Sequence, residues 1–215
     1  MNIMIIVPHP DDEVLGFGGA IQGHIEQGDR VFVYYINANN SKREIQQYKD
    51  LQSVSKYLKF QSIVKNIKLN DTNFKKCINY IENEIEKIKP DILYTVFYGD
   101  NHQDHEYIFK AVKIATRIWS SFLVKKIYLG EILSSTDQAP KNLLHTFCPT
   151  HYVALREDQV IRKSKSISMY KNEVMQWPHP RSEKGIINLA ERRGSECKSL
   201  YAEAFVILRD IKELA

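Results

Sequence analysis

Apolar residues gather along this chain in short continuous runs separated by longer amphipathic stretches. Residues 3–7 (IMIIV), 31–37 (VFVYYIN) and 91–97 (DILYTVF) are rich in aliphatic, β-branched and aromatic side chains. Such runs are typical of strands buried on both faces of a sheet. We predict two further strands at residues 62–67 and 125–132.

Between these strands, apolar residues recur at helical spacing. We predict helices over residues 14–28, 43–58, 73–88 and 105–119. The first helix is predicted to end at Gly28, and the third is predicted to end before Pro90. The alternation of strands and helices predicts an α/β fold, with a mostly parallel, three-layer Rossmann-like sheet that carries helices on both faces.

The pattern loosens beyond residue 135. We expect strands at 150–156 and 203–209 and helices at 157–172 and 184–193. A chain of 215 residues is long enough for one well-packed domain. We therefore interpret residues 1–215 as a single domain, with 135–215 as its C-terminal extension.

Two polar clusters follow predicted parallel strands. His9-Pro10-Asp11-Asp12-Glu13 comes after the first strand, and residues 99–105 (GDNHQDH) come after the fourth. In sheets of this class ligands bind outside the carboxyl ends of the strands, at the point where the strand order reverses. The first and fourth strands are commonly neighbours there, so we expect the two clusters to converge on one crevice.

The composition of these clusters favours a metal site. One imidazole and three carboxylates in a single turn are costly to bury unless a cation compensates for their charge. His102 and His105 are three residues apart, which puts them on one face of a helix. Two histidines and one carboxylate, with room for water, are typical of a hydrolytic zinc site.

Other interpretations of the same residues have to be weighed. Asp11 or Asp12 alone would most often be a solvated turn residue or a helix cap, and an HxxH spacing alone is a weak signal. Two histidines and a carboxylate also describe the ligands of Fe(II) oxygenases. A second carboxylate beside the ligand favours hydrolysis, because it offers a general base.

Charge and composition narrow the range of partners. The net charge is +4, but the basic residues are spread out. We interpret the densest cluster, Lys163, Lys165 and Lys171, as a solvated helix face and not a nucleic-acid surface. A modest positive field also suits an anionic substrate. The apolar run at the start of the chain is too short for a signal peptide or a membrane span, so we expect a cytoplasmic protein without a membrane partner.

The motifs resemble those of a known family. HPDDEVLGFGGAI together with the downstream HQDH is similar to the LmbE/PIG-L family of metal-dependent N-deacetylases, whose two signatures are HPDDE and HxDH. The final GSECKSLYAEAFVILR also resembles that family's closing segment. The likeness spans nearly the whole chain, although only the two motifs are highly specific.

The resemblance implies a ligand set and a metal. His9 and Asp12, the first histidine and second aspartate of HPDDE, would bind the metal. His105, the last histidine of HxDH, would be the third ligand. The expected metal is Zn²⁺, with Fe²⁺ or another divalent ion as the alternative.

The resemblance also implies catalytic roles. Asp11 would be the base that deprotonates the attacking water. His102 would act as an acid or stabilise the tetrahedral intermediate, and Asp104 would orient it and keep it protonated. The glycines Gly16, Gly18 and Gly19 would let the backbone approach the site closely.

Further polar residues are weaker candidates for the mouth of the crevice. Family members often carry an arginine on the helix after the second strand, and Arg43 is the candidate for it here. Glu131 and the segment 177–181 (WPHPR) are the others, with Trp177 either a core aromatic or a sugar-stacking residue. The remaining histidines are predicted to be structural or exposed: His24, His145, His151 and His179.

The expected function is hydrolysis of the N-acetyl group of a small-molecule amino-sugar substrate, either by a monomer or by a homo-oligomer. The substrate itself stays open. One rival is another metal-dependent amidase on the same scaffold, such as one that acts on thiol conjugates. Another is a sugar- or nucleotide-binding module with a structural metal. A base at Asp11 argues against that module, because a structural site does not need one.

Overall fold

The central element of the structure is a seven-stranded sheet with the strand order β3-β2-β1-β4-β5-β7-β6. This computed structural model describes residues 1–37, 41–140, 142 and 146–213. The strands are β1 (Asn2–Val7), β2 (Arg30–Ile36), β3 (Gln61–Lys65), β4 (Ile92–Val96), β5 (Lys126–Gly130), β6 (His151–Leu155) and β7 (Tyr201–Asp210).

The first five strands are parallel, as their apolar runs predict. β1 lies in the middle because its side chains are apolar on both faces, and it is buried from Ile3 onward. It pairs with β4 in a register that sets Ile3 beside Ile92. The chain therefore reverses its strand order between β1 and β4, and the expected adjacency of these two strands is confirmed.

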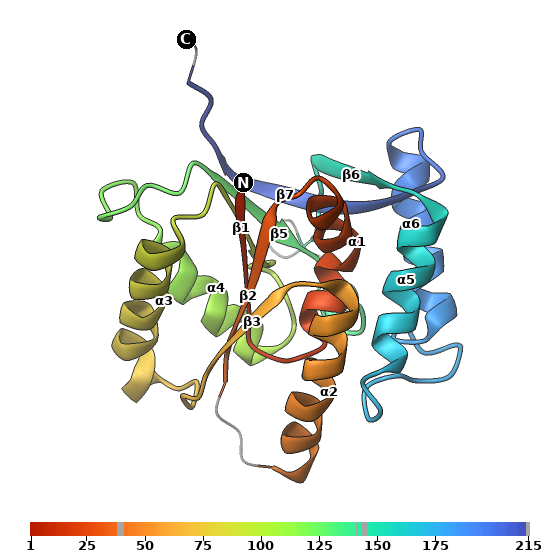
Figure 1. Ribbon diagram of the computed structural model, residues 1–215, viewed down its shortest axis with the longest axis horizontal. Helices are drawn as coiled ribbons and strands as arrows, with labels where there is room; N and C mark the ends of the chain where they lie inside the picture. Colours follow the sequence, from red (N-terminus) through yellow and green to blue (C-terminus); the bar gives the residue numbers. More distant parts are fainter. Residues whose placement is uncertain (38–40, 141, 143–145, 214–215) are drawn as a thin grey trace.

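Helices cover both faces of the sheet, which confirms the predicted three-layer α/β architecture (Figure 1). One side carries α3 and α4, and the other carries α1, α2, α5 and α6 (Figure 1). None of the helices in the described ranges is both long and apolar enough to cross a lipid bilayer. Their bounds are α1 (Asp12–Glu26), α2 (Lys42–Leu58), α3 (Phe74–Ile88), α4 (Gln103–Ala115), α5 (Glu157–Ser168) and α6 (Glu183–Glu196), with short 3-10 turns at Asp71–Asn73 and Thr136–Gln138.

Helix α1 is held against the C-terminal strands by a buried glutamate. Both carboxylate oxygens of Glu203 accept backbone N–H groups of α1, from Gly19 at 2.7 Å and from Ala20 at 2.8 Å. A β-carbon on Gly19 would lie 2.4 Å from a methyl group of Leu155. Gly16, Gly18 and Gly19 therefore allow close packing against neighbouring side chains, and the expectation that they bring the backbone close to the site is not met.

Lys163 also departs from its prediction as a solvated residue. Its ammonium group lies 2.6 Å from Glu203, and both side chains are buried. Helical spacing placed Lys163 on α5 but did not show that this face of the helix packs on α1 and β7. The lysine compensates for the charge of a carboxylate that would be costly to bury alone.

Candidate metal centre

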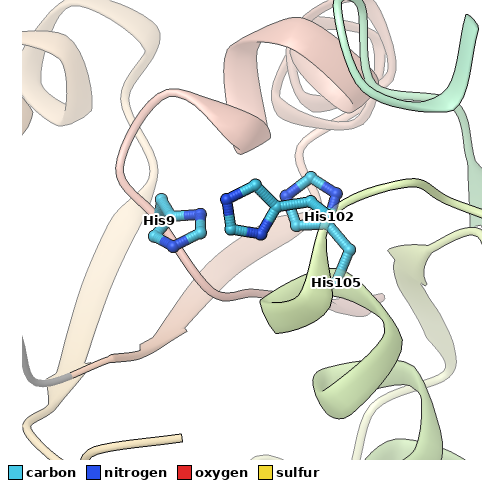
Figure 2. A group of neighbouring side chains, drawn as sticks. All are labelled: His9, His102 and His105. Atoms are coloured by element: carbon cyan, nitrogen blue, oxygen red, sulfur yellow. The ribbon is translucent and has the colours of Figure 1, made fainter. Parts of the chain in front are cut away.

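The two predicted clusters meet at the carboxyl ends of β1 and β4. His9 comes from the turn after β1, and His102 and His105 come from the start of α4 (Figure 2). The ring centroids of His9 and His102, and those of His102 and His105, are 4.9 Å apart. Each of the three rings offers a nitrogen, and these nitrogens all lie within 4.8 Å of one another.

Asp12 lies between two of these histidines. Its Oδ2 atom is 3.3 Å from Nδ1 of His9, and its Oδ1 atom is 3.2 Å from Nε2 of His105. Tetrahedral zinc, with bonds of about 2.0–2.1 Å, separates its ligand atoms by about 3.3 Å. Imidazole and carboxylate groups at these separations fit a divalent ion of the zinc type. Asp12 and His105 are almost completely buried, so an ion would also compensate for a buried carboxylate.

A further carboxylate lies behind each of the histidines that contact Asp12. Nε2 of His9 is 2.9 Å from Oδ2 of Asp104. Nδ1 of His105 is 3.1 Å from Oδ1 of Asp100, at an angle that falls short of a straight hydrogen bond. A carboxylate on the far nitrogen fixes the tautomer of a metal-binding histidine and raises its basicity. His9 and His105 each have this support.

Asp100 was not predicted as a site residue. Its carboxylate accepts the backbone N–H of His102 at 2.8 Å and the hydroxyl groups of Ser135 and Thr136. These contacts fix Asp100 beneath His105 at the start of α4. Asp100 does stand in the GDNHQDH cluster, but the sequence pattern does not show which nearby acid faces which histidine.

His102 differs from the other two histidines. It is the N-cap residue of α4, and its Nδ1 atom accepts the backbone N–H of Asp104 at 3.1 Å. Because Nδ1 is the acceptor, the proton of the neutral ring sits on Nε2. Burial lowers the pKa of His102, and the neighbouring charges of His105 and His9 lower it further. The carboxylate of Asp104 contacts His9 instead of His102, so the expectation that Asp104 keeps His102 protonated is not supported.

Asp11 has an unusual backbone conformation. Its φ is 125° and its ψ is −33°, a region that side-chain-bearing residues rarely adopt. Its N–H donates to the Glu13 carboxylate at 2.9 Å, and its carbonyl accepts the N–H groups of Val14 and Leu15. The Asp11 carboxylate contacts Arg181 at 2.9 Å, whereas Asp12 contacts the histidines.

Glu13 supports this strained turn from within the protein. It is fully buried and accepts the hydroxyl of Tyr170 at 2.6 Å. Burial raises the pKa of Glu13 to about 7, although the Tyr170 hydroxyl acts in the opposite direction. Burial also raises the pKa of Asp11, and the charge of Asp12 adds to the effect while Arg181 opposes it. A raised pKa makes Asp11 a stronger base than an exposed carboxylate.

The carboxylates of the centre raise the pKa values of His9 and His105. Burial alone would lower the pKa of His9, but its contacts with Asp104 and Asp12 outweigh burial and raise that pKa to about 9. Burial also acts to lower the pKa of His105, while Asp12 and Asp100 raise it to about 10. Burial opposes ionisation of Asp12, yet His105 holds the pKa of this carboxyl well below its usual range. The carboxylates thus favour the protonated form of both histidines.

A cavity of about 360 Å³ opens beside these groups. Of the weaker candidates, Arg43 and Arg181 line it, and Glu131 and Trp177 do not. Glu131 forms a two-pronged ion pair with Arg193 away from this cavity. The other lining residues are His9, Asp11, Ser41, Glu44, Gln47, His102, Asp104, His105 and Glu173.

Of the remaining histidines, the three that the structure describes lie outside the cavity lining. His24 contacts Asp29 and a tyrosine hydroxyl, and His151 stacks on Tyr128. Nδ1 of His179 accepts the backbone N–H of Arg181. These three have structural contacts, as predicted, whereas His145 is outside the described residues.

Comparison with known proteins identifies relatives of this chain. The model of the PIG-L family, described as GlcNAc-PI de-N-acetylase, matches residues 4–116, which is more than half of the chain. The matched segment contains both histidine motifs. The chain has no significant match among curated protein sequences.

Solved structures share the fold at low sequence identity. N,N′-diacetylchitobiose deacetylase from Pyrococcus horikoshii has a TM-score of 0.71 at 16% identity, over 96% of this chain and 83% of that one. A zinc-inhibited form of a teicoplanin deacetylase has a TM-score of 0.74 at 15% identity, over 99% and 100%. A 4-carboxy-2-hydroxymuconate hydratase from Pseudomonas putida KT2440 has a TM-score of 0.72 at 14% identity, over 100% and 99%. Because one of the three is named as a hydratase, the likeness supports the fold and not a particular reaction.

Proposed function

The chain belongs to the PIG-L family, and we propose that it is a metal-dependent hydrolase that removes the N-acetyl group of an amino-sugar substrate. The observation that carries this proposal is the unequal environment of the three histidines. His9 and His105 share Asp12 and are each backed by a carboxylate, while His102 has no such support in the described part of the chain. Two supported histidines and a carboxylate form one ligand set, and His102 is left for chemistry.

His9, Asp12 and His105 would hold the ion, with zinc as the proposed metal and Fe²⁺ as the alternative. Their imidazole and carboxylate donors and their separations suit either metal. A bound ion of this kind supplies Lewis-acid activation of a carbonyl and of a water. His102 is a poor ligand by comparison, because its Nδ1 lone pair is already used by a backbone N–H and its Nε2 carries the proton.

Asp11 and His102 would divide the proton transfers between them. Asp11 lines the cavity and has a raised pKa, so it is suited to accept the proton of the attacking water. His102 presents Nε2–H to the same cavity, so it is suited to donate a hydrogen bond to the oxygen of the tetrahedral intermediate. Protonated Asp11 or His102 would then deliver a proton to the leaving amine.

Arg43 is the proposed contact for the rest of the substrate. Its side chain is 60% exposed and lines the cavity from the first turn of α2. A guanidinium suits hydroxyl, carboxylate or phosphate oxygens. The substrate would thus be a small N-acetylated sugar derivative whose further groups lie along α2.

The test is acetate release from a panel of N-acetylated amino sugars. The panel would include N-acetylglucosamine, its 1-phosphate, N,N′-diacetylchitobiose and a thiol-conjugate amide. Each would be offered to protein stripped with a chelator and to protein reloaded with zinc or Fe²⁺. We expect acetate only from the reloaded protein. Full metal occupancy without turnover of any member would favour the binding module, and turnover limited to thiol-conjugate amides would favour the rival amidase.

A further inference from the structure

The loop of residues 169–182, between α5 and α6, contacts the turn after β1 (His9–Glu13) at two points. Near its start, Tyr170 donates its hydroxyl to Glu13. Near its end, Arg181 donates to Asp11. Backbone hydrogen bonds within the loop, such as Glu173 to Tyr170 and Ser182 to His179, hold its shape. A segment distant in sequence therefore reaches the proposed base directly.

Arg181 has three partners that fix its guanidinium. Its Nη1 atom donates to Oδ2 of Asp11 at 2.9 Å and to Oε2 of Glu173 at 3.0 Å. Its Nε atom donates to Oγ of Ser134 at 2.6 Å. The side chain is only 18% exposed and forms part of the cavity wall. A guanidinium held on two edges has a single orientation, unlike a solvated arginine.

Glu173 is the anchor of this arrangement. It is fully buried, and its carboxylate also accepts two hydrogen bonds from Arg43, at 2.7 Å to Nε and 2.5 Å to Nη2. A buried carboxylate with two arginine partners cannot move without leaving charges unpaired in the protein interior. Glu173 thereby links Arg181 to Arg43 of α2, outside the metal centre.

Asp11 is a side chain that needs such support. Its backbone has a positive φ, and its Oδ2 atom accepts a hydrogen bond from Arg181. Among the described residues, no hydrogen bond reaches its Oδ1 atom, and Asp11 lines the cavity. One oxygen is thus fixed by the arginine, and the other is left for the cavity.

We propose that Arg181 is a positioning residue that, anchored by Glu173 and Ser134, holds the Asp11 carboxylate with its second oxygen toward the cavity. This inference rests on the proposed function of Asp11 as the base. It gives the loop of residues 169–182, which lies outside both histidine motifs, a part in the reaction. An arginine that bound substrate directly, or one that only stabilised the fold, would behave differently in the following tests.

The first test is a double-mutant cycle in the zinc-loaded protein. Arg181→Ala should lower kcat about 10- to 100-fold with little change in KM, the scale expected when a charged hydrogen bond is lost and a reacting group is misplaced. In an Asp11→Asn background the same substitution should change kcat by less than about threefold, because the group it positions no longer acts as a base. An equal loss in both backgrounds overturns the proposal, and so does a rise in KM that persists in both.

Further variants separate positioning from folding. Arg181→Lys keeps the charge and one donor, so it should recover part of kcat. Glu173→Gln should lower kcat in wild type and have little further effect once Arg181 is alanine. Arg192→Ala is the matched control, since that side chain is 73% exposed and pairs with Glu196 on the surface of α6. Metal content should stay at the wild-type level in every variant.

A crystal structure of Arg181→Ala tests the inference without turnover. We expect the Asp11 carboxylate to leave its wild-type position while His9, Asp12 and His105 keep theirs. An unmoved Asp11 overturns the positioning role even in an enzyme that releases acetate. Conversely, a displaced Asp11 in a protein that releases no acetate from any substrate supports the positioning and rejects the proposed function.

Discussion

The two walls of the cavity are built differently. One consists of the turn after β1 and the start of α4, and it contributes the imidazoles and carboxylates that would perform the reaction. The other consists of the first turn of α2 and the loop of residues 169–182, and it contributes arginines tied to one buried glutamate. The histidines are thus supported by carboxylates of their own wall, whereas the Asp11 carboxylate is held by an arginine from a distant part of the chain.

The two walls should respond to substitution in different ways. Changes in the first wall should remove the metal or a proton-transfer group, so their effects on activity should be large. Changes in the second should displace groups that remain present, so their effects should be smaller. Substitutions in both walls, measured side by side, test this difference.

The largest effect is expected for His105→Ala. Loss of a group that only supports a ligand costs about 10- to 100-fold in metal affinity, so loss of a ligand should exceed that range. Elemental analysis should find about one zinc or iron in wild type and little in the variant. His24→Ala is the matched control, because His24 lies near the other end of α1 and contacts Asp29. Full occupancy in His105→Ala would remove His105 from the ligand set.

His102→Ala should come next. The loss of one donor to the oxyanion should lower kcat about 10²- to 10³-fold. The zinc content should stay near that of wild type, because His9, Asp12 and His105 remain. Loss of metal from this variant would instead indicate that all three histidines are ligands in wild type. The separations of their ring nitrogens also permit this.

Smaller losses are expected for the acids behind the histidines. Asp100→Asn and Asp104→Asn should each weaken zinc affinity by about 10- to 100-fold. Asp100 should have the larger effect, because it is buried while the Asp104 side chain is 29% exposed. Competition with a chelator measures both affinities. An Asp104 variant that binds zinc as tightly as wild type would mean that Asp104 does not support His9.

The pH dependence of stability follows from the same histidines. In the metal-free protein the pKa of His9 is raised to about 9 and that of His105 to about 10, from the usual 6.5. Their contribution to stability is therefore fully present below pH 6.5 and is lost as the pH rises through 9 to 10. Zinc needs the deprotonated rings, so the increase in Tm on adding zinc should grow from pH 6.5 to pH 9. Paired melting curves measure it, and an increase that does not change with pH contradicts this account.

The smallest effect is expected for Tyr170→Phe in the second wall. It removes the hydroxyl donor of the buried Glu13, which should cost about 1–3 kcal/mol in free energy of unfolding. The metal content should not change, because Glu13 contacts the backbone of Asp11 and not the ligands. Denaturant unfolding measures the loss. A loss of zinc from this variant would show that the two walls are not independent.

Sequence patterns predicted the fold and the first wall well for a physical reason. Buried parallel strands have continuous apolar runs, and their carboxyl ends converge at one edge of the sheet, so His9 and His105 could be brought together without a structure. The helix at residue 105 was predicted two residues late, because His102 serves as its N-cap and its first turn is polar. β6 and β7 were predicted as strands, but their antiparallel pairing and their place in the sheet were not.

The second wall could not be predicted in the same way. Tyr170, Glu173 and Arg181 are single polar residues in a loop, and only their tertiary contacts make them a group. Arg181 did belong to the segment 177–181 that was expected near the crevice, whereas Glu131 was expected there and instead pairs with Arg193. Side-chain partners of this kind depend on packing between distant segments, and spacing in the sequence does not specify it.

We propose that the adjacent aspartates of the turn have different tasks, with Asp12 binding the metal and Asp11 acting as the base. The direct test measures metal content and kcat for Asp11→Asn and Asp12→Asn side by side. Asp11→Asn should keep its metal and lose about 10²- to 10⁴-fold in kcat. Asp12→Asn should lose metal and recover part of its activity in excess zinc. Loss of metal from Asp11→Asn, or normal turnover by it, would contradict the account.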